Sequence, residues 1–344
     1  GYPWFLAQLH ALGFELGFPV ARAVSILATL STMVIIFIIV RREAGLPYGA
    51  IAVGVYAALF RTNGAFYDLA RPDALVMFLV LLGVYAAYVS RSWRGIILSG
   101  VIFVVAFFTK QTSSVFVPAL ALYLLHRNWR EGLLFLTITF GITGCLIYAY
   151  SVSSGGWFWT YIFEGHQGHL FYWKNILMEY WRDVLCLAPL LLLLPLLWLS
   201  HWRAFGVICL LLAAHWSYAV VLRGMTLDYV PHMYYRELLY ESPRWMVIVP
   251  PIVLGGLFLL YRWLNRHAPA DRTSGFWLLM YIAGVGASGL NHSTQWAYSN
   301  CFMPMSVFAA ILVAIAFRDL MAEGRRARMI LPVAMAIQFT AWTY

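Results

Sequence analysis

The sequence predicts an all-α fold, a polytopic bundle of about 11 to 12 transmembrane helices. Hydrophobic residues make up 62% of the chain and charged residues only 11%, with a mean hydropathy of +0.77. A soluble domain carries about 25% charged residues, so this composition indicates an integral membrane protein. Several runs reach the roughly 18 to 20 apolar residues that cross a bilayer. No stretch resembles a soluble domain, so residues 1–344 are predicted to form a single transmembrane domain.

The first predicted element is an interfacial helix at 3–17, and twelve spans follow it. The spans lie at 20–40, 48–60, 72–90, 95–109, 113–126, 132–152, 184–200, 204–221, 245–263, 274–290, 301–317 and 329–343. Turn residues or charges occupy the breaks between them, as helix ends require. The chain starts at Gly1 rather than Met and ends close to an apolar run, so we expect a preceding helix and further C-terminal residues.

The breaks between spans differ in charge on the two predicted sides of the membrane. Alternate breaks, beginning with RREAGLP at 41–47, hold 14 of the 23 Lys and Arg residues. The positive-inside rule places these breaks in the cytoplasm. Nine of the fourteen acids fall on the other side, which gathers the polar chemistry on the outer face. The net charge of +9 is therefore interpreted as membrane topology, and no nucleic-acid partner is predicted.

The most charged outer stretch is RTNGAFYDLARPD, residues 61–73, between two apolar segments. Ionisable groups at a membrane boundary are costly, which favours a functional role for Arg61, Asp68, Arg71 and Asp73. Asp73 and Asp68 are the candidate catalytic residues, and the two arginines are candidate substrate ligands. The alternative is an anchor at the headgroups, with Asp73 only complementing a helix dipole.

Lys110 follows a predicted span directly, in the stretch FFTKQTSS. Of the 23 basic residues 21 are arginine, so this lysine is unusual. It is a candidate point-charge contact to phosphate. The alternative is a side chain that extends to the lipid headgroups.

The long outer loop at 153–183 combines a dense aromatic segment with Glu164, His166 and His169. Such groups suit hydrogen bonding to a sugar or phosphate, and we predict substrate binding for all three. A divalent metal is an alternative because of the H-x-x-H spacing, but no fixed ligand motif matches and no metal ligand or cofactor is assigned. Interfacial packing of the aromatic residues is a third interpretation.

Two later stretches add candidate substrate ligands. Arg236 lies in a charged, tyrosine-rich stretch at 223–245, for which a solvated loop is the alternative. Tyr298 and Asn300 follow His292 in a polar stretch at 289–312, which could instead cap two helices. No phosphate-binding loop, dinucleotide fingerprint or protease motif occurs, so these soluble chemistries have no support.

Several segments together resemble a known family. The segments GYPWFLAQLHALGFELGFPVARAVSILATL, ARPDALVMFLVLLGVY, GGWFW and AYSNCFMPM resemble those of C-type polytopic glycosyltransferases. The similarity is to the dolichyl-phosphate-mannose–protein mannosyltransferase-like group, which includes lipid A aminoarabinose transferases. The resemblance implies the glycosyltransferase C-like fold. It also implies transfer of a sugar from a polyprenyl-phosphate carrier to a lipid, glycan or protein acceptor on the non-cytoplasmic face.

The resemblance assigns one residue directly. Asp73 matches the family's second acidic position, whereas the principal catalytic acid lies in an outer loop upstream of Gly1. Arg71 stands two residues before the acid, a smaller gap than the family pattern has. The resemblance implies a bacterial inner-membrane enzyme with a periplasmic active face.

The residues alone support the same reaction. Arg61, Arg71 or Lys110 would bind the donor phosphate, and Asp73 or Asp68 would assist or orient the base. A transporter or flippase for an anionic lipid or sugar is the alternative, which predicts charges through the depth of the spans. A non-catalytic membrane scaffold is the third hypothesis.

Overall fold

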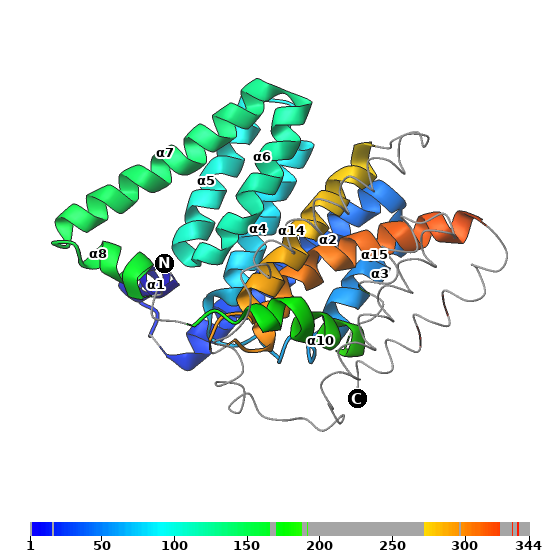
Figure 1. Cartoon of the computed structure of the whole chain (residues 1–344), viewed down its shortest axis with the longest axis horizontal. Helices are drawn as coiled ribbons and strands as arrows, with labels where there is room; N and C mark the ends of the chain where they lie inside the picture. Colours follow the sequence, from blue (N-terminus) through cyan, green and yellow to red (C-terminus); the bar gives the residue numbers. More distant parts are fainter. Residues whose placement is uncertain are drawn as a thin grey trace.

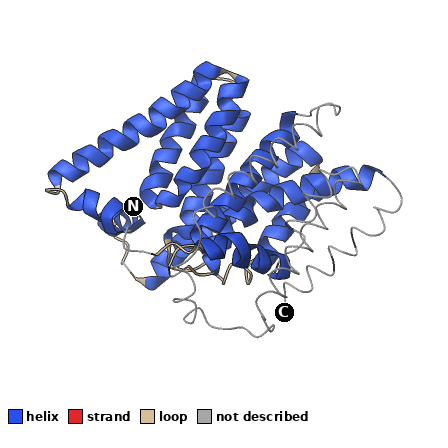
Figure 2. Cartoon of the chain, in the orientation of Figure 1, coloured by secondary structure: helices blue, strands red, loops and turns tan. Residues whose placement is uncertain are grey.

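The computed structural model describes residues 2–15, 17–165, 170–187, 272–295 and 297–323, and the single positions 191, 332 and 336. The described chain is a bundle of helices, which confirms the predicted all-α class (Figures 1 and 2). The only β-bridge among these residues joins Phe171 to Thr294. The predicted spans at 204–221 and 245–263 lie outside the described residues, as do most of those at 184–200 and 329–343, so the count of twelve stays a prediction.

The first half of the chain forms seven longer helices that follow the predicted spans closely. They are α1 (Tyr2–Ala11), α2 (Phe18–Ala44), α3 (Leu46–Ala58), α4 (Pro72–Val89), α5 (Trp93–Thr109), α6 (Phe116–Arg127) and α7 (Trp129–Ser153), with the 3₁₀-helix η1 (Gln111–Val115) before α6. The predicted interfacial helix ends earlier than expected, at Ala11. Four described helices are long and apolar enough to cross a membrane: α2, α4, α7 and the segment Ser299–Ala322.

The later described elements combine several short helices with two longer ones, α14 and α15, of 21 residues each. They are α8 (Trp157–Trp159), the π-helices η2 (Thr160–Glu164) and η3 (Asn175–Glu179), α10 (Tyr180–Leu187), α14 (Arg272–His292), the 3₁₀-helix η7 (Ser299–Phe302) and α15 (Met303–Glu323). The stretch at 153–183, predicted as a loop, is therefore largely helical.

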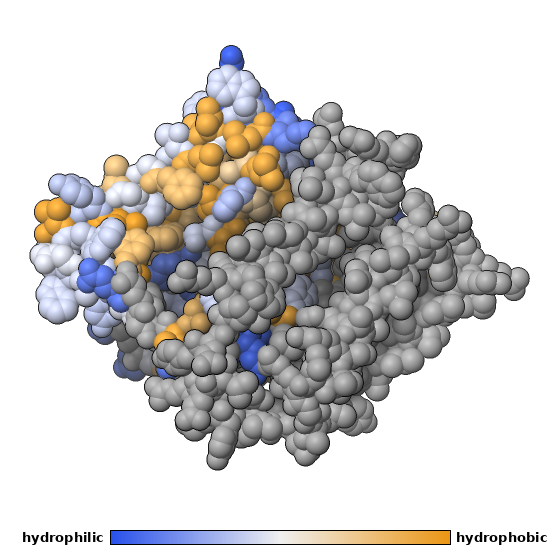
Figure 3. Space-filling model, in the orientation of Figure 1, coloured by the Kyte–Doolittle hydropathy of each residue, from blue (hydrophilic) through white to orange (hydrophobic). Residues whose placement is uncertain are grey.

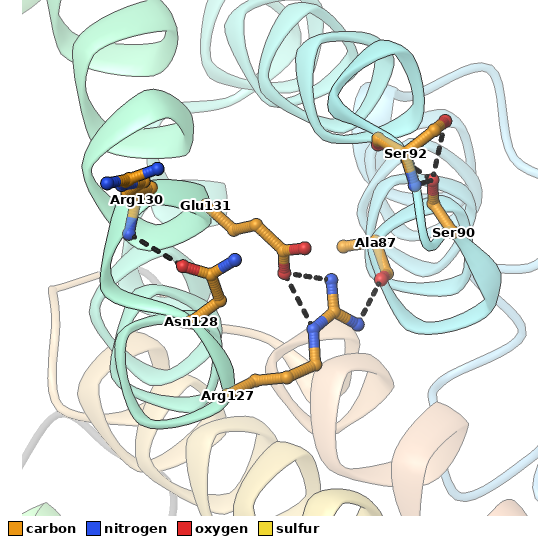
Figure 4. A network of polar contacts seen from close by, with 7 residues as sticks. All are labelled: Ala87, Ser90, Ser92, Arg127, Asn128, Arg130 and Glu131. Carbon is orange, nitrogen blue, oxygen red and sulfur yellow. Dashed lines mark hydrogen bonds and ion pairs between the residues drawn. The ribbon is translucent and has the colours of Figure 1, made fainter.

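Local sequence explains where the long helices begin and end. Pro19, Pro47 and Pro72 each stand in the first two positions of a helix, where a missing N–H costs nothing. Between α2 and α3 the chain turns at Gly45, whose φ of 99° is readily adopted only by glycine. Asn128 caps α7 by accepting a hydrogen bond from the Arg130 N–H (Figure 4).

The core of the described bundle is α15. It packs against α14, α2, α3 and α4, and its apolar window is fully buried. In contrast, only 22% of the α7 window is buried, because α7 packs mainly on α5 and α6 at the edge of the bundle (Figure 1). Apolar side chains such as Leu133 and Phe140 on α7 are exposed. Figure 3 shows hydrophobic patches between paler and more hydrophilic residues in this region. An exposed apolar face of this kind suits contact with lipid.

The ends of the helices form two separate polar regions. The site end contains the starts of α2, α4 and α15 and the end of α5, joined by contacts of Asp68, Asp73 and Asn300. The opposite end contains the ends of α2, α4, α6 and α15 and the start of α7, joined by contacts of Glu43, Arg127 and Arg318. The predicted alternation of the spans is thus confirmed for α2 to α7 and α15.

Candidate functional site

The loop between α3 and α4, residues 59–71, is fixed by buried hydrogen bonds. Asn63 is fully buried and its Nδ2 donates to the Leu59 carbonyl at 2.8 Å and to Tyr67 Oη at 3.0 Å. Tyr67 Oη donates to the Tyr56 carbonyl at 2.9 Å, and Thr29 on α2 donates to the Tyr67 carbonyl at 2.6 Å. Burial raises the pKa of the Tyr67 phenol well above its usual range, so it stays a neutral donor. The loop therefore presents its charged residues on a rigid base.

Asp68 is paired with a residue that the sequence analysis did not select. The Arg22 guanidinium on α2 forms an ion pair with the Asp68 carboxylate, and its Nε donates to the Asp68 carbonyl at 3.2 Å. Ser25, one turn further along α2, donates to the Arg71 carbonyl at 3.2 Å. These contacts fasten the loop to α2 and neutralise the Asp68 charge.

Asp73 is the centre of the site. Its side chain is 4% exposed in the first turn of α4. Oδ1 accepts hydrogen bonds from Lys110 Nζ at 2.6 Å and from Asn300 Nδ2 at 2.8 Å. Arg71 Nε lies 3.4 Å from Oδ2, which accepts no hydrogen bond from the described residues. We refer to Arg71, Asp73, Lys110 and Asn300 as the Asp73 cluster.

The Asp73 cluster carries a net positive charge, because two cations share one carboxylate. The Arg71 side chain is 45% exposed and that of Lys110 is 28% exposed, so both cations are accessible from outside. Arg71 also lies over the Phe66 ring, at 5.0 Å from the centroid, and Phe66 stacks with Tyr298. Tyr298 is exposed and borders the cluster on the side of Phe66.

A comparison with known protein families finds a match in the first part of the chain. Residues 1–154 match the family model of the dolichyl-phosphate-mannose-protein mannosyltransferases. The match confirms the resemblance to C-type membrane glycosyltransferases. No curated protein and no solved structure matches the chain.

The mannosyltransferase match covers most of the site, because Asp68, Arg71, Asp73 and Lys110 all lie within residues 1–154. Asn300 lies outside the matched residues and reaches Asp73 from η7, 227 positions away in the chain. The family is one of membrane glycosyltransferases, and the apolar helices are those of an integral membrane protein.

The other predicted site residues are not drawn together by the described contacts. Arg61 is exposed at the start of the loop. Glu164 is exposed at the end of η2 and accepts a hydrogen bond from Thr160 at 2.8 Å. His166, His169 and Arg236 lie outside the described residues. Among the residues that the structure does describe, no group of three side chains could hold a metal ion.

Two further polar pairs beside the site, one ion pair and one hydrogen bond, were missed by the sequence analysis. Lys174 and Glu179 are 3.1 Å apart, with side chains 8% and 7% exposed. His292 Nε2 lies 3.2 Å from Asp183 Oδ2, and the histidine side chain is also 8% exposed. The second pair joins positions 109 residues apart, so no spacing in the sequence could have revealed it.

Proposed function

We propose that the protein transfers a sugar from a polyprenyl-phosphate carrier to a lipid, glycan or protein acceptor. One observation supports this above all: Lys110, Arg71 and Asn300, from three separate segments, converge on the buried Asp73 carboxylate. The excess positive charge of the cluster suits the phosphate that links such a carrier to its sugar.

Each residue of the Asp73 cluster has a role in this reaction. Arg71 and Lys110 bind the donor phosphate, and Asp73 with Asn300 holds Lys110 in place. As the acceptor oxygen bonds to the anomeric carbon, the carbon–oxygen bond to the phosphate breaks. The acceptor hydroxyl gives its proton to a carboxylate base, which Asp73 or Asp68 assists or orients. The leaving phosphate gains negative charge, which the two cations stabilise. Asp68 positions the loop through Arg22.

The second hypothesis, a transporter or flippase, requires charges along the depth of the spans. In the described helices the charged residues lie within the first or last two turns, as on α2, α4 and α15. Buried polar residues nearer the middle are neutral, such as Thr32 and Ser99. This distribution favours an enzyme site at one membrane boundary over a path through the bundle.

A transfer assay tests the proposal directly. The protein is reconstituted in lipid vesicles with radiolabelled dolichyl-phosphate mannose and a crude acceptor membrane fraction, and transferred label is counted. We expect transfer by the wild type and loss of transfer in the double variant Arg71→Ala, Lys110→Ala. Label that crosses the bilayer but stays on the lipid carrier would instead favour the flippase hypothesis.

The membrane orientation is part of the proposal, with the site end on the non-cytoplasmic face. Single cysteines at Tyr161, beyond the end of α7, and at Ser92, between α4 and α5, mark the two ends. With the native cysteines replaced by serine, an impermeant maleimide added to intact cells should label Tyr161→Cys and spare Ser92→Cys. The reverse pattern would contradict the orientation.

The proposal also gives a binding role to three residues that follow α8 in the chain. Glu164, His166 and His169 hydrogen-bond the sugar or phosphate, or bind a divalent metal. Loss of transfer on adding EDTA, with recovery on adding Mn²⁺ or Mg²⁺, would favour the metal. Transfer that persists in EDTA would favour hydrogen bonding.

A further inference from the structure

The pair formed by Asp183 and His292 leaves one buried atom unexplained. A carboxylate only accepts hydrogen bonds, so His292 Nε2 donates to Asp183 Oδ2 at 3.2 Å. In the neutral ring, Nδ1 then carries no hydrogen and can only accept. Nδ1 is buried, and no residue in the described part of the chain donates to it. Buried polar atoms almost always have a partner, so this acceptor is available to a ligand.

One helical turn connects this histidine to the Asp73 cluster. The 3₁₀-helix η7 carries Asn300, which donates to Asp73, and Phe302, whose ring lies 5.6 Å from the His292 ring. A 3₁₀-helix rises about 2 Å per residue, so these two positions are about 4 Å apart along its axis. Cys301 between them is within electrostatic range of Asp73, Lys110 and Asp183. The histidine and the Asp73 cluster therefore both contact the single short helix η7.

The histidine is also held rigidly. Tyr180 packs against the imidazole at 5.8 Å between centroids, and Tyr180 Oη donates to the Val285 carbonyl at 3.1 Å. Asn175 Nδ2 donates to the His292 carbonyl at 3.4 Å. Tyr180 also stacks with Phe302 at 5.8 Å between centroids, so the imidazole packs against a pair of aromatic rings that contact each other. A hydrogen-bond acceptor held in this way is suited to select one hydroxyl group of a bound ligand.

We propose that Nδ1 of His292 accepts a hydrogen bond from a hydroxyl group of the donor's sugar. The proposal rests on the proposed function, because it requires a sugar bonded directly to a phosphate that Arg71 and Lys110 hold. Asp183 is a positioning residue in this arrangement, since it fixes the tautomer in which Nδ1 carries no hydrogen.

Two lipids that differ only in the sugar test the proposal by binding alone. Dissociation constants of dolichyl-phosphate mannose and of dolichyl phosphate are measured by tryptophan fluorescence with the purified protein in nanodiscs. His292→Gln keeps an N–H donor near the Nε2 position and removes the Nδ1 acceptor. His292→Asn places an amide oxygen near the Nδ1 position instead. His126→Gln, an exposed histidine at the opposite end of the bundle, is the matched control.

We expect the wild type and His126→Gln to bind the mannose lipid more tightly than dolichyl phosphate. His292→Gln should weaken binding of the mannose lipid about two- to tenfold, as expected for one hydrogen bond, and leave dolichyl phosphate unchanged. His292→Asn should recover part of the lost affinity. Size-exclusion chromatography confirms that each variant is folded.

Three results would overturn the proposal. The first is equal affinity of the wild type for both lipids, and the second is unchanged binding of the mannose lipid by His292→Gln. The third is an equal loss of affinity for both lipids in His292→Gln, which would indicate that the pair of Asp183 and His292 is purely structural. Failure of the proposed function has a different signature. In that case Arg71→Ala, Lys110→Ala would bind dolichyl phosphate as tightly as the wild type does.

Discussion

The two ends of the bundle use charge in different ways. At the opposite end, cations donate to backbone carbonyls where helices finish. Arg127 donates to the Ala87 carbonyl at 3.1 Å and to Glu131 at 2.7 Å, as Figure 4 shows, and Arg318 donates to the Glu43 carbonyl. The last carbonyls of a helix lack partners within it, so these contacts satisfy backbone groups and complement the helix dipole.

At the site end, charged side chains contact mainly one another. Asp73 stands in the first turn of α4 and is approached by Lys110 and Arg71, which leaves a positive excess. Its Oδ2 and the Nδ1 of His292 are buried without hydrogen bonds from the described residues. The comparison separates a region whose cations satisfy the last carbonyls of helices from one whose cations gather around a single buried carboxylate and exceed its charge.

The largest loss of sugar transfer is expected for substitution of Asp73. Asp73→Asn keeps the shape of the side chain but removes the charge that orients Lys110 and Arg71. The two cations would then repel each other without a counter-charge, and transfer should fall about 100-fold or more in the vesicle assay. Asp319→Asn, in the ion pair with Arg318 at the opposite end, is the control and should retain normal transfer. Equal transfer by wild type and Asp73→Asn would remove Asp73 from the mechanism.

A smaller effect is expected for the individual cations. Lys110→Ala should weaken binding of dolichyl phosphate about tenfold, the value of one charge-assisted hydrogen bond, and Arg71→Ala should act similarly. Added salt should reduce the difference from wild type, because both side chains are partly exposed. Arg94→Ala, an exposed arginine at the opposite end, should bind like the wild type. Tight binding by Lys110→Ala would place the phosphate elsewhere.

Much of this architecture was predictable from local signals. Continuous apolar runs and prolines located α2 to α7 within a few residues, and charge asymmetry gave the alternation of their ends. The concentration of acids next to apolar runs made Asp73 a candidate, and the rarity of lysine drew attention to Lys110. The fold brings these two side chains into contact, and their roles in the reaction stay predictions. Such signals lie within one segment of about 20 residues, which is why a single sequence reveals them.

Contacts between distant segments could not be predicted in this way. Asn300 reaches Asp73 over 227 positions, and His292 reaches Asp183 over 109. The sequence analysis did not select Arg22, but the fold pairs it with Asp68. Tertiary packing decides such pairs, and neither residue type nor spacing specifies them. The predicted roles of Glu164, His166, His169 and Arg236 stay predictions.

The opposite end should respond to mutation with a change in stability rather than activity. Arg127→Ala removes the hydrogen bond to the Ala87 carbonyl and the ion pair with Glu131. We expect the free energy of unfolding to fall by about 1–3 kcal/mol, seen as a lower Tm, because the Arg127 and Glu131 side chains are largely buried. Transfer per folded molecule should stay normal. Loss of transfer in this variant without loss of stability would contradict the claim that only the site end takes part in the reaction.

The smallest effect is expected for substitution of Gly64, where the loop at 59–71 touches η7. We expect the free energy of unfolding to fall by about 1 kcal/mol. The φ of Gly64 is +64°, and an added Cβ would lie 2.9 Å from the Ser299 Cβ, next to Asn300. Gly64→Ala therefore combines backbone strain with a displacement of η7, and transfer should fall several-fold along with the Tm. Gly155→Ala separates the two causes, because Gly155 has a similar φ of +61° but open space around its Cβ position. We expect Gly155→Ala to lower only the Tm. If both variants lower transfer equally, strain alone explains the loss, and the contact between the loop and η7 does not position Asn300.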